Sequence, residues 1–281
     1  MLSLTLALVL FLNLVLAARS PGCGKSATIK SQTYSTTING KSRQYIIRLP
    51  NNYNNTRAYR LIFTWHQLGS SASSIAAGED PNKGGVLAYY GLPPLANESA
   101  IFVVPNGISN GWANSGGEDV SFYDKMRDTV ENDLCVDTSL RFHTGFSYGG
   151  GMSFAIACAR GKETRAVAVI SGSQLSGCAG GNDGVAYYGQ HGTKDSVLPV
   201  ANGRALRDKF VKNNGCTAVT ETQPGSNGKS VKTVYKGCKE GLPLTWVIHG
   251  GDHNPSQTDS GSSKPFAPGN SWEFFEQFKS V

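Results

Sequence analysis

The sequence predicts an α/β protein whose mostly parallel, doubly wound sheet lies in a single domain. Strand-like and helix-like segments alternate through most of the chain, a pattern typical of parallel strands joined by helical crossovers. The 281 residues, less a leader of 17, suit one large domain that can bury a sizeable core. The sequence contains no internal repeat and no linker-like stretch, which favours one domain over two.

The leader is an apolar run over residues 4–16 that ends in Val15-Leu16-Ala17-Ala18. This run is shorter than the roughly 20 residues that a membrane-spanning helix needs. The small residues after it suit cleavage by signal peptidase. We therefore expect residues 1–17 to be a signal peptide, residues 18–281 to form the domain, and the protein to be secreted. The alternative is a buried amino-terminal helix.

The first half of the domain begins with strands. Residues 43–49 (RQYIIRL) and 60–65 (RLIFTW) are rich in β-branched and aromatic side chains, which favour strands. Residues 101–105 (IFVVP) form a short apolar run that is typical of a strand buried on both faces. Apolar residues at helical spacing then predict a helix at 121–134, from Phe122 to Leu134.

The second half continues the alternation. A strand at 141–146 is followed by a helix of small residues at 148–159, and the run AVAVI at 166–170 reads as another buried strand. The remaining predicted elements are a strand at 185–190, a helix at 200–211, a strand at 244–249 and a closing amphipathic helix at 272–278.

The overall charge and the cysteines bound the class of protein. The net charge is +6 and the pI is about 9.0, but the lysines and arginines are scattered, which argues against nucleic-acid binding. An even number of cysteines in a secreted chain predicts three disulfides, with Cys216–Cys238 the favoured pair and the other pairings open. The six cysteines are Cys23, Cys135, Cys158, Cys178, Cys216 and Cys238. The sequence contains no Cys-x-x-Cys pair and no histidine cluster, so it does not predict a metal site. Sequons at Asn54 and Asn97 predict glycosylation.

A serine nucleophile is predicted at position 147. Gly145-Phe146-Ser147-Tyr148-Gly149 matches the Gly-x-Ser-x-Gly elbow, in which a serine sits on a sharp turn between a strand and a helix. A second match, centred on Ser109, runs into a Gly- and Asn-rich stretch that cannot form a stable helix, so Ser109 is interpreted as a loop residue. The strand before Ser147 and the helix after it are those of the α/β-hydrolase fold.

A serine hydroxyl needs a base, and in this fold the order along the chain is serine, acid, histidine. His253 is the favoured base, because it lies in a loop beyond the strand at 244–249, and His249 at the end of that strand is the alternative. His191 precedes the favoured acid, so the order argues against it as the base. His66 and His143 precede the nucleophile and are interpreted as structural or near the mouth of the site.

The predicted acid is Asp195, which follows the strand at 185–190 and precedes the helix at 200–211. The alternative role for Asp195 is that of a turn or helix-capping residue. Asp183 and Asp208 are rivals for the acid, whereas Asp252 is too close in sequence to His253 for the usual geometry.

Two backbone N–H groups are needed to hold the oxyanion. One is predicted at Tyr148, directly after the nucleophile. The other is expected in the loop after an early strand, at Leu68, with Gln67 as the alternative.

Three motifs occur in order along the chain: residues 111–120 (GWANSGGEDV), residues 144–152 (TGFSYGGGM) and residues 191–195 (HGTKD). Together they resemble the motifs of fungal feruloyl esterases. These esterases belong to carbohydrate esterase family 1, together with acetylxylan esterases and polyhydroxybutyrate depolymerase-like lipases. The resemblance spans nearly the whole domain. It implies an α/β-hydrolase with Ser147, Asp195 and His253 as its triad. It also implies that Trp112, in a loop that faces the substrate, binds substrate; the alternative is a core tryptophan that anchors a Gly-rich loop.

The resemblance also implies a function. The expected reaction is hydrolysis of ferulate or p-coumarate esters on arabinoxylan or pectin, by a monomer that needs no cofactor and no metal. The alternatives with the same triad are an acetylxylan esterase and a polyester depolymerase. A carbohydrate-binding protein on an inactive hydrolase fold and a serine peptidase are further alternatives. We expect no nucleic-acid partner and no membrane partner.

Overall fold

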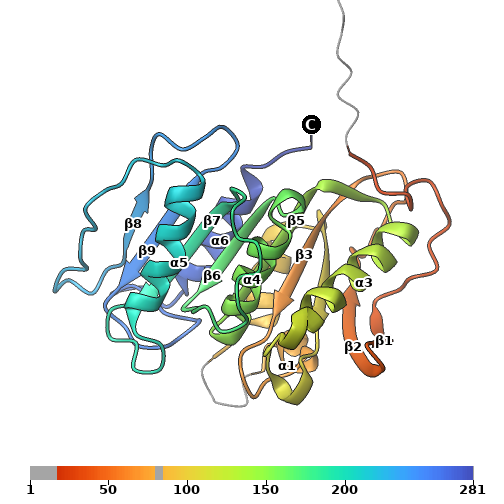
Figure 1. The fold of residues 1–281 in the computed structure, drawn as a ribbon, viewed down its shortest axis with the longest axis horizontal. Coiled ribbons are helices and arrows are strands. Elements are labelled where there is room, and N and C mark those ends of the chain that lie inside the picture. The colour runs from red at the N-terminus through yellow and green to blue at the C-terminus, as the bar shows by residue number, and fades with distance from the viewer. Residues whose placement is uncertain (1–17, 80–84, 281) are drawn as a thin grey trace, which may run out of the picture.

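A mixed sheet runs through the middle of the molecule (Figure 1). The computed structural model describes residues 18–79 and 85–280; the predicted signal peptide, residues 1–17, lies outside them. In these residues the sheet has nine strands in the order β1-β2-β4-β3-β5-β6-β7-β9-β8. The six strands from β4 to β9 pair in parallel, whereas β1, β2 and β8 are antiparallel to their neighbours. The predicted fold class is confirmed.

The strands and their bounds follow the apolar runs of the sequence. The strands are β1 (Gln32–Ile38), β2 (Lys41–Arg48), β3 (Tyr59–Trp65), β4 (Ala100–Pro105), β5 (Val136–Phe146), β6 (Ala166–Ile170), β7 (Ala186–Gly192), β8 (Val231–Val234) and β9 (Leu244–His249). Every residue of β4, β6, β7 and β9 is buried, as expected for parallel strands covered on both faces. Apolar composition therefore identifies the centre of the sheet.

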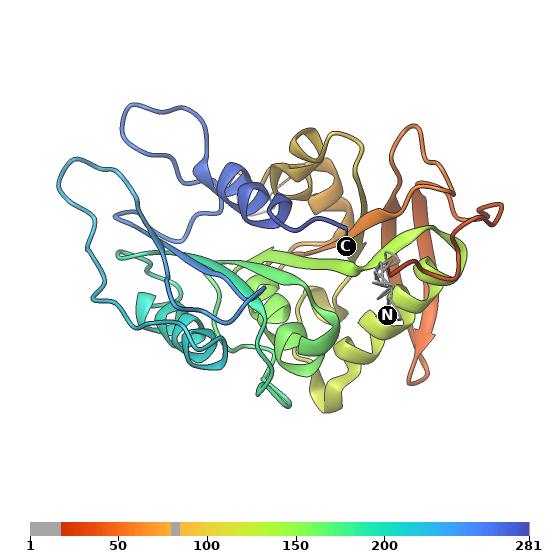
Figure 2. The same cartoon turned by 90° about the horizontal axis from the view of Figure 1, so that it is seen from above.

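Helices cover both faces of the sheet. They are α1 (Ala72–Ala77), α2 (Leu92–Ala96), α3 (Glu118–Asp133), α4 (Tyr148–Ala159), α5 (Val200–Asn213) and α6 (Phe266–Glu276). Figure 2 shows α3, α4 and α5 on one face and α6 on the other, where α1 and α2 share its core. No helix of residues 18–79 and 85–280 is both long enough and apolar enough to cross a bilayer.

Several elements differ from the sequence prediction, among them the short helices α1 and α2, which were not predicted. The last helix begins at Phe266, earlier than the predicted start at residue 272. The earlier start is possible because Pro268 falls in the first turn, where its missing N–H breaks no helical hydrogen bond. The strands β1 and β8 were not predicted. Both are edge strands, and their polar sequences, QTYSTTI and VKTV, alternate between partly buried and exposed side chains. These two strands form because the backbones of their neighbours, β2 and β9, supply hydrogen-bond partners.

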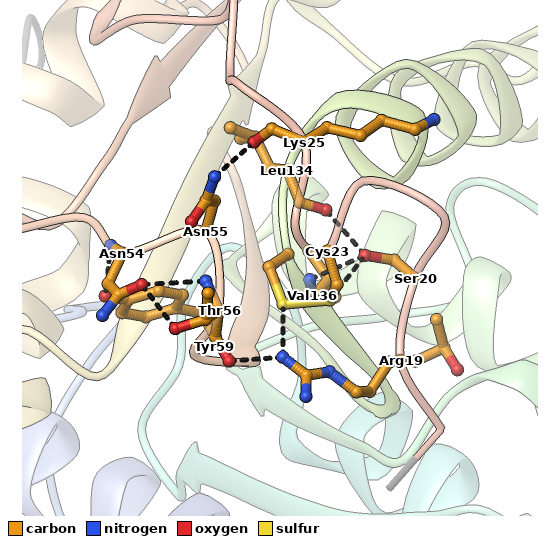
Figure 3. The surroundings of a disulfide bond; sticks show 12 residues. Arg19, Ser20, Cys23, Lys25, Asn54, Asn55, Thr56, Tyr59, Leu134 and Val136 are labelled. Atoms are coloured by element: carbon orange, nitrogen blue, oxygen red, sulfur yellow. Dashed lines mark hydrogen bonds between the residues drawn. A yellow bond between two sulfur atoms is a disulfide. The ribbon is translucent and has the colours of Figure 1, made fainter.

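All six cysteines form disulfides, and the predicted pair Cys216–Cys238 is confirmed. The other two pairs are Cys23–Cys135 and Cys158–Cys178. Figure 3 shows the surroundings of the bond between Cys23 and Cys135. There Ser20 donates its hydroxyl to the carbonyl of Leu134 at 2.6 Å and accepts the N–H of Val136 at 2.8 Å. The beginning of the domain is thus held against the start of β5.

The Cys23–Cys135 bond is expected to contribute more stability than the Cys158–Cys178 bond. It joins residues 112 positions apart, whereas the second joins residues 20 apart. By loop-closure entropy, replacing both cysteines with alanine should lower the free energy of unfolding by about 5 kcal/mol for the first bond and by about 3 kcal/mol for the second. Urea unfolding of the two double variants measures the difference. Equal losses would show that loop length does not govern this stability.

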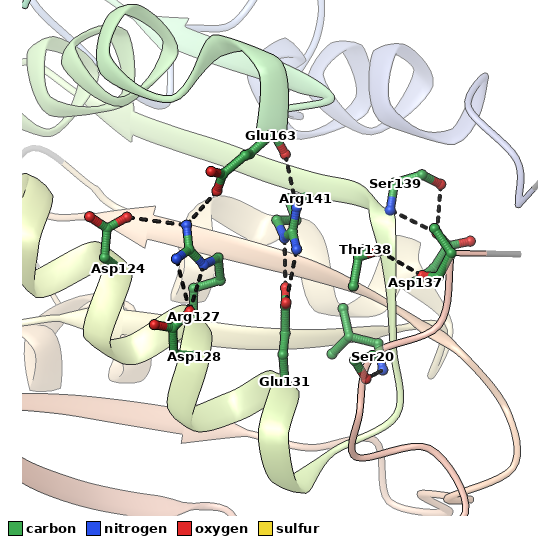
Figure 4. A network of polar contacts seen from close by, with 12 residues as sticks. Ser20, Asp124, Arg127, Asp128, Glu131, Asp137, Thr138, Ser139, Arg141 and Glu163 are labelled. Atoms are coloured by element: carbon green, nitrogen blue, oxygen red, sulfur yellow. Dashed lines mark hydrogen bonds and ion pairs between the residues drawn. The ribbon is translucent and has the colours of Figure 1, made fainter.

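An ionic network fixes the amino-terminal half of β5 (Figure 4). Arg141 on β5 binds both carboxylate oxygens of Glu131 on α3, at 2.6 and 2.8 Å. Arg127, one turn earlier on α3, pairs with Asp124 and with Glu163 in the turn after α4. Bidentate, partly buried pairs of this kind hold geometry better than exposed single contacts. The network therefore orients β5, the strand that leads to Ser147.

Candidate active site

Ser147 occupies a strained turn between β5 and α4. Its backbone angles are φ 57° and ψ −120°, a conformation that side-chain-bearing residues rarely adopt. The N–H of Ser147 donates to the carbonyl of Ile170 at the end of β6, at 2.9 Å. Strain of this kind persists only where the surroundings enforce it, and it concentrates at functional sites. The sharp strand-to-helix turn predicted for Ser147 is confirmed.

The glycines on either side of Ser147 are required by close packing. A Cβ at Gly145 would lie 2.4 Å from the backbone carbon of Gly149, and a Cβ at Gly149 would lie 2.0 Å from the carbonyl oxygen of Trp65 on β3. Neither distance leaves room for a methyl group. The Gly-x-Ser-x-Gly pattern thus lets α4 pass close to β5 and β3.

Asp195 and His253 lie in contact. The Nδ1 of His253 is 2.7 Å from Oδ2 of Asp195. The other oxygen, Oδ1, accepts the N–H groups of Val197 and Leu198 at 3.0 and 2.7 Å. Because a carboxylate only accepts, Nδ1 of His253 carries the hydrogen and Nε2 is left as the basic nitrogen.

The ring of His253 packs beside the nucleophile's turn. Its centroid is 4.5 Å from that of Phe146, the residue that precedes Ser147. The His253 side chain is 11% exposed, so the imidazole is largely covered but open to the surface on one side. The structure therefore brings His253 to both Asp195 and the turn of Ser147.

The rival residues lie elsewhere. The ring of His249 packs against Phe266 of α6, and burial lowers its pKa to about 4, so that it is uncharged near neutral pH. Asp183 precedes β7 and lies at the amino end of the parallel strands, opposite Ser147. Asp208 is an exposed residue of α5. Ser109 lies in a short exposed turn, and the next α-helix begins only at Glu118, so Ser109 is a loop residue as predicted.

Asp252 is a residue whose role was missed in the sequence. Its carboxylate accepts the N–H and hydroxyl of Ser196, both at 2.8 Å, and the N–H of His253 at 2.7 Å. The N–H of Lys194 also donates to the carbonyl of Gly251 at 3.2 Å. These bonds join the loop of Asp195 to the loop of His253. The adjacency of Asp252 to His253, which argued against it as the acid, suits it to cap this loop instead.

His66 fixes the loop after β3. Its Nδ1 is 2.8 Å from the carbonyl oxygen of Gln67, and its Nε2 is 2.9 Å from the N–H of Gly107. These partners place the hydrogen on Nδ1, and burial lowers the pKa of His66 to about 4. Since the carbonyl and N–H of a trans peptide point in opposite directions, the N–H of Leu68 points away from His66.

Leu68 and Tyr148 border the same point. A Cβ at Gly111 would lie 3.1 Å from the Tyr148 ring and 3.2 Å from a methyl group of Leu68. Tyr148 is the first residue of α4, so its N–H has no acceptor within the helix. The two predicted oxyanion donors thus belong to neighbouring residues.

Trp112 differs from the expectation of a substrate-facing side chain. Its indole is fully buried and donates from Nε1 to the carbonyl of His66 at 2.7 Å. The ring packs edge-on against Trp65, with centroids 5.0 Å apart. Trp112 therefore anchors its loop from below, because the core beneath the loop has room for the indole and an acceptor for its N–H.

The same loop is tied to the sheet by a buried ion pair. Asp119 lies 2.7 Å from Arg43 of β2, and both side chains are almost fully buried. The second oxygen of Asp119 accepts the N–H of Asn114 at 2.9 Å. The motif at residues 111–120 therefore has a structural role: its residues anchor the loop that borders Leu68 and Tyr148.

The charge of Asp195 is set by its donors. Burial acts to raise the pKa of Asp195, but hydrogen bonds from His191, His253 and the N–H of Leu198 outweigh it and hold this pKa well below its usual range. Asp195 is thus ionised near neutral pH. Within residues 18–79 and 85–280, no group of three histidine, cysteine or acidic side chains is arranged to bind a metal ion.

Comparison with known proteins decides the family. The chain is 63% identical to feruloyl esterase D of Neurospora crassa over 265 residues, which cover 93% of the chain and 91% of that relative. It is 46% identical to feruloyl esterase C of Emericella nidulans over 259 residues, 92% of the chain and 91% of that relative. The chain belongs to the feruloyl esterases. No family model matches it.

Solved structures with the same fold as this feruloyl esterase are more distant in sequence. A family 1 ferulic acid esterase from Anaeromyces mucronatus aligns with a TM-score of 0.55 at 15% identity, over 91% of the chain and 93% of that protein. An acetyl xylan esterase from Aspergillus awamori aligns with a TM-score of 0.57 at 16% identity, over 87% of the chain and 99% of that protein. These likenesses support the α/β-hydrolase fold of the esterase.

Proposed function

We propose that this feruloyl esterase is secreted and releases ferulic or p-coumaric acid from esterified plant cell-wall polysaccharide, such as arabinoxylan or pectin. The observation that carries the proposal is the contact of His253 with Asp195 beside the strained turn of Ser147. This is the arrangement that a serine hydrolase needs, with a nucleophile, a base and an acid that holds the base. The identity to named feruloyl esterases supports the acyl group.

The reaction proceeds in two steps. The Oγ of Ser147 attacks the ester carbonyl while Nε2 of His253 accepts its proton, and Asp195 stabilises the imidazolium that forms. The imidazolium then donates its proton to the departing sugar oxygen, which leaves an acyl-enzyme on Ser147. Water, deprotonated by His253, releases the hydroxycinnamic acid in the second step.

The negative charge of each tetrahedral intermediate is held by two N–H groups, those of Tyr148 and Leu68. Tyr148 stands at the amino terminus of α4, where the helix dipole also favours a negative charge. The bonds that His66 makes to the Gln67 carbonyl and to Gly107 aim the Leu68 N–H before substrate binds. They favour Leu68 over Gln67 as the second donor.

The surroundings of Ser147 favour an aromatic acyl group over acetyl. The exposed apolar side chains Leu68, Ile108, Leu175 and Val197 follow β3, β4, β6 and β7. These strands flank β5 on both sides, so their carboxyl-end loops surround Ser147. An aromatic ring gains from such a rim because it buries roughly 150 Å² or more, whereas an acetyl group buries little.

Replacing Leu175 with serine tests the acyl group. We expect kcat/KM for methyl ferulate to fall about tenfold, because apolar contact with the ring is lost, and the rate of acetate release from acetylated xylan to stay unchanged. The control is Val234→Ser, which changes an exposed apolar residue on the edge strand β8. If the parent enzyme is more active on acetylated xylan than on methyl ferulate, the protein is instead an acetylxylan esterase.

Three observations support secretion. The chain has three disulfides, which form and persist in oxidising compartments. The side chains of Asn54 and Asn97 are exposed, so that glycans can be attached there. The carbonyl of Ala18 accepts the N–H of Thr138 at 2.6 Å, so a chain cut after Ala17 keeps its first residue on β5.

A further inference from the structure

We propose that His191 is a positioning residue that holds Asp195 in place for His253, an inference that rests on the proposed triad. His191 is the next-to-last residue of β7 and is fully buried. Its Nε2 lies 3.1 Å from Oδ2 of Asp195, the oxygen that His253 contacts, and 2.8 Å from the carbonyl oxygen of Leu198. The triad acid therefore has a second histidine on the same oxygen.

The surroundings of His191 make its Nε2 a hydrogen-bond donor. Both neighbours of Nε2 are acceptors, so this nitrogen carries the hydrogen. The other nitrogen, Nδ1, is buried and has no hydrogen-bond partner among the described residues. It faces Gly203 of α5, where a Cβ would lie 2.2 Å from Nδ1.

Gly203 is further evidence that the position of the ring matters. Glycine in the middle of a helix costs about 1 kcal/mol relative to alanine. α5 (Val200–Asn213) carries this glycine where the His191 ring meets the helix. The helix thus gives up stability at the point that lets His191 reach Asp195.

His191 has two effects on Asp195. Together with the N–H groups of Val197 and Leu198 on Oδ1, it fixes the direction of the carboxylate, and so the direction in which His253 is held. A donor on Oδ2 also draws electron density from the carboxylate, which then stabilises the His253 imidazolium less strongly. Without the donor, the Asp195 carboxylate should stabilise the His253 imidazolium more strongly.

Few other ionisable groups stand around this pair. His249 lies beside His191 from β9 and is uncharged, and Asp252 is an exposed residue of the His253 loop. Arg204 and Arg207 follow Gly203 on α5, and both are paired with Glu221. A change at His191 therefore acts on His253 chiefly through Asp195.

The test compares His191→Gln with His191→Met. The two side chains are nearly the same size, but only glutamine can offer an N–H where Nε2 stands. For His191→Met we expect kcat for methyl ferulate to fall 10- to 100-fold with KM nearly unchanged, since the buried residue cannot touch substrate. We also expect the acid limb of the kcat/KM profile to move up by about half a pH unit. His191→Gln should recover most of both changes.

The control is His143→Met. His143 is also fully buried, but it lies between Phe63 and Tyr123 in the core and does not contact Asp195. This variant should lose stability without moving the acid limb. If His191→Met does not fold, Gly203→Ala displaces the ring instead and should move the acid limb in the same direction.

The proposal would be overturned if His191→Met and His191→Gln had the same kcat as each other and neither moved the acid limb of the kcat/KM profile. That result is distinct from a failure of the triad itself, in which Ser147→Ala would retain activity.

Discussion

Replacing Ser147 with alanine is expected to lower kcat for methyl ferulate by about 10⁵-fold or more, because no other group can form the acyl-enzyme. The temperature of unfolding should stay nearly the same. Alanine keeps the Cβ and the backbone angles of the turn, and the hydroxyl that it removes is not what holds Ser147 to β6: that is the N–H bond to Ile170. The kinetic assay and calorimetry measure the two effects separately.

The matched control for this variant is Ser109→Ala. Ser109 stands in the second Gly-x-Ser-x-Gly match of the chain but lies in an exposed turn. It should retain full activity. A fluorophosphonate should label the parent and the Ser109 variant and leave the Ser147 variant unlabelled. Full activity in Ser147→Ala, or labelling at another serine, would refute the assignment of the nucleophile.

Replacing Asp195 with asparagine should lower kcat by about 10⁴-fold while the protein stays folded. An asparagine amide can donate to Nδ1 of His253, which then carries its hydrogen on Nε2. A ring in that tautomer cannot accept the proton of Ser147. The substitution keeps the shape of the side chain, so the acceptor for the Val197 and Leu198 N–H groups remains. Steady-state kinetics with methyl ferulate measure the loss.

Asp208→Asn serves as the control, since Asp208 is an exposed aspartate on α5 whose partner is Arg207. It should leave kcat unchanged.

The pH dependence of stability gives an independent readout of the Asp195→Asn variant. The pKa of Asp195 is lower in the folded than in the unfolded chain, so its ionised form favours folding above a pH of about 4, and this contribution is lost as the pH falls. Asp195→Asn should therefore lose more stability at pH 7 than in strong acid. Equal losses at both pH values would contradict the assigned ionisation.

The centre of the sheet could be predicted because its strands carry their own signal. β4, β6 and β9 are buried on both faces, so they read as continuous apolar runs. The edge strands β1 and β8 could not be predicted, since their side chains are largely polar and only the ladder of a neighbour orders them. The early start of α6 was missed for a different reason: its first turn contains a proline, which sequence reasoning takes as a boundary.

The candidate site divides in a similar way. The turn of Ser147 could be predicted because it is local. The two glycines beside Ser147 are visible in the sequence, and the structure requires them because the backbones pass too closely there for a Cβ atom. The order of residues favoured Asp195 and His253, but it could not exclude His249, because the two histidines are four positions apart. Order also set His191 aside as the base without indicating what it contacts. Trp112 was placed near substrate because its motif resembles the substrate-facing loop of the family, whereas its side chain points into the core.

By itself, the sequence determined the class of fold, the central strands, the nucleophile's turn and the family motifs, because each depends on residues close together in the chain. Only the tertiary structure decided that His253 rather than His249 contacts Asp195, which disulfides accompany Cys216–Cys238, and that Trp112 is an anchor. Each of these depends on contacts between segments far apart in sequence. Those contacts follow from how the loops pack together at the carboxyl ends of the parallel strands, which no local pattern encodes.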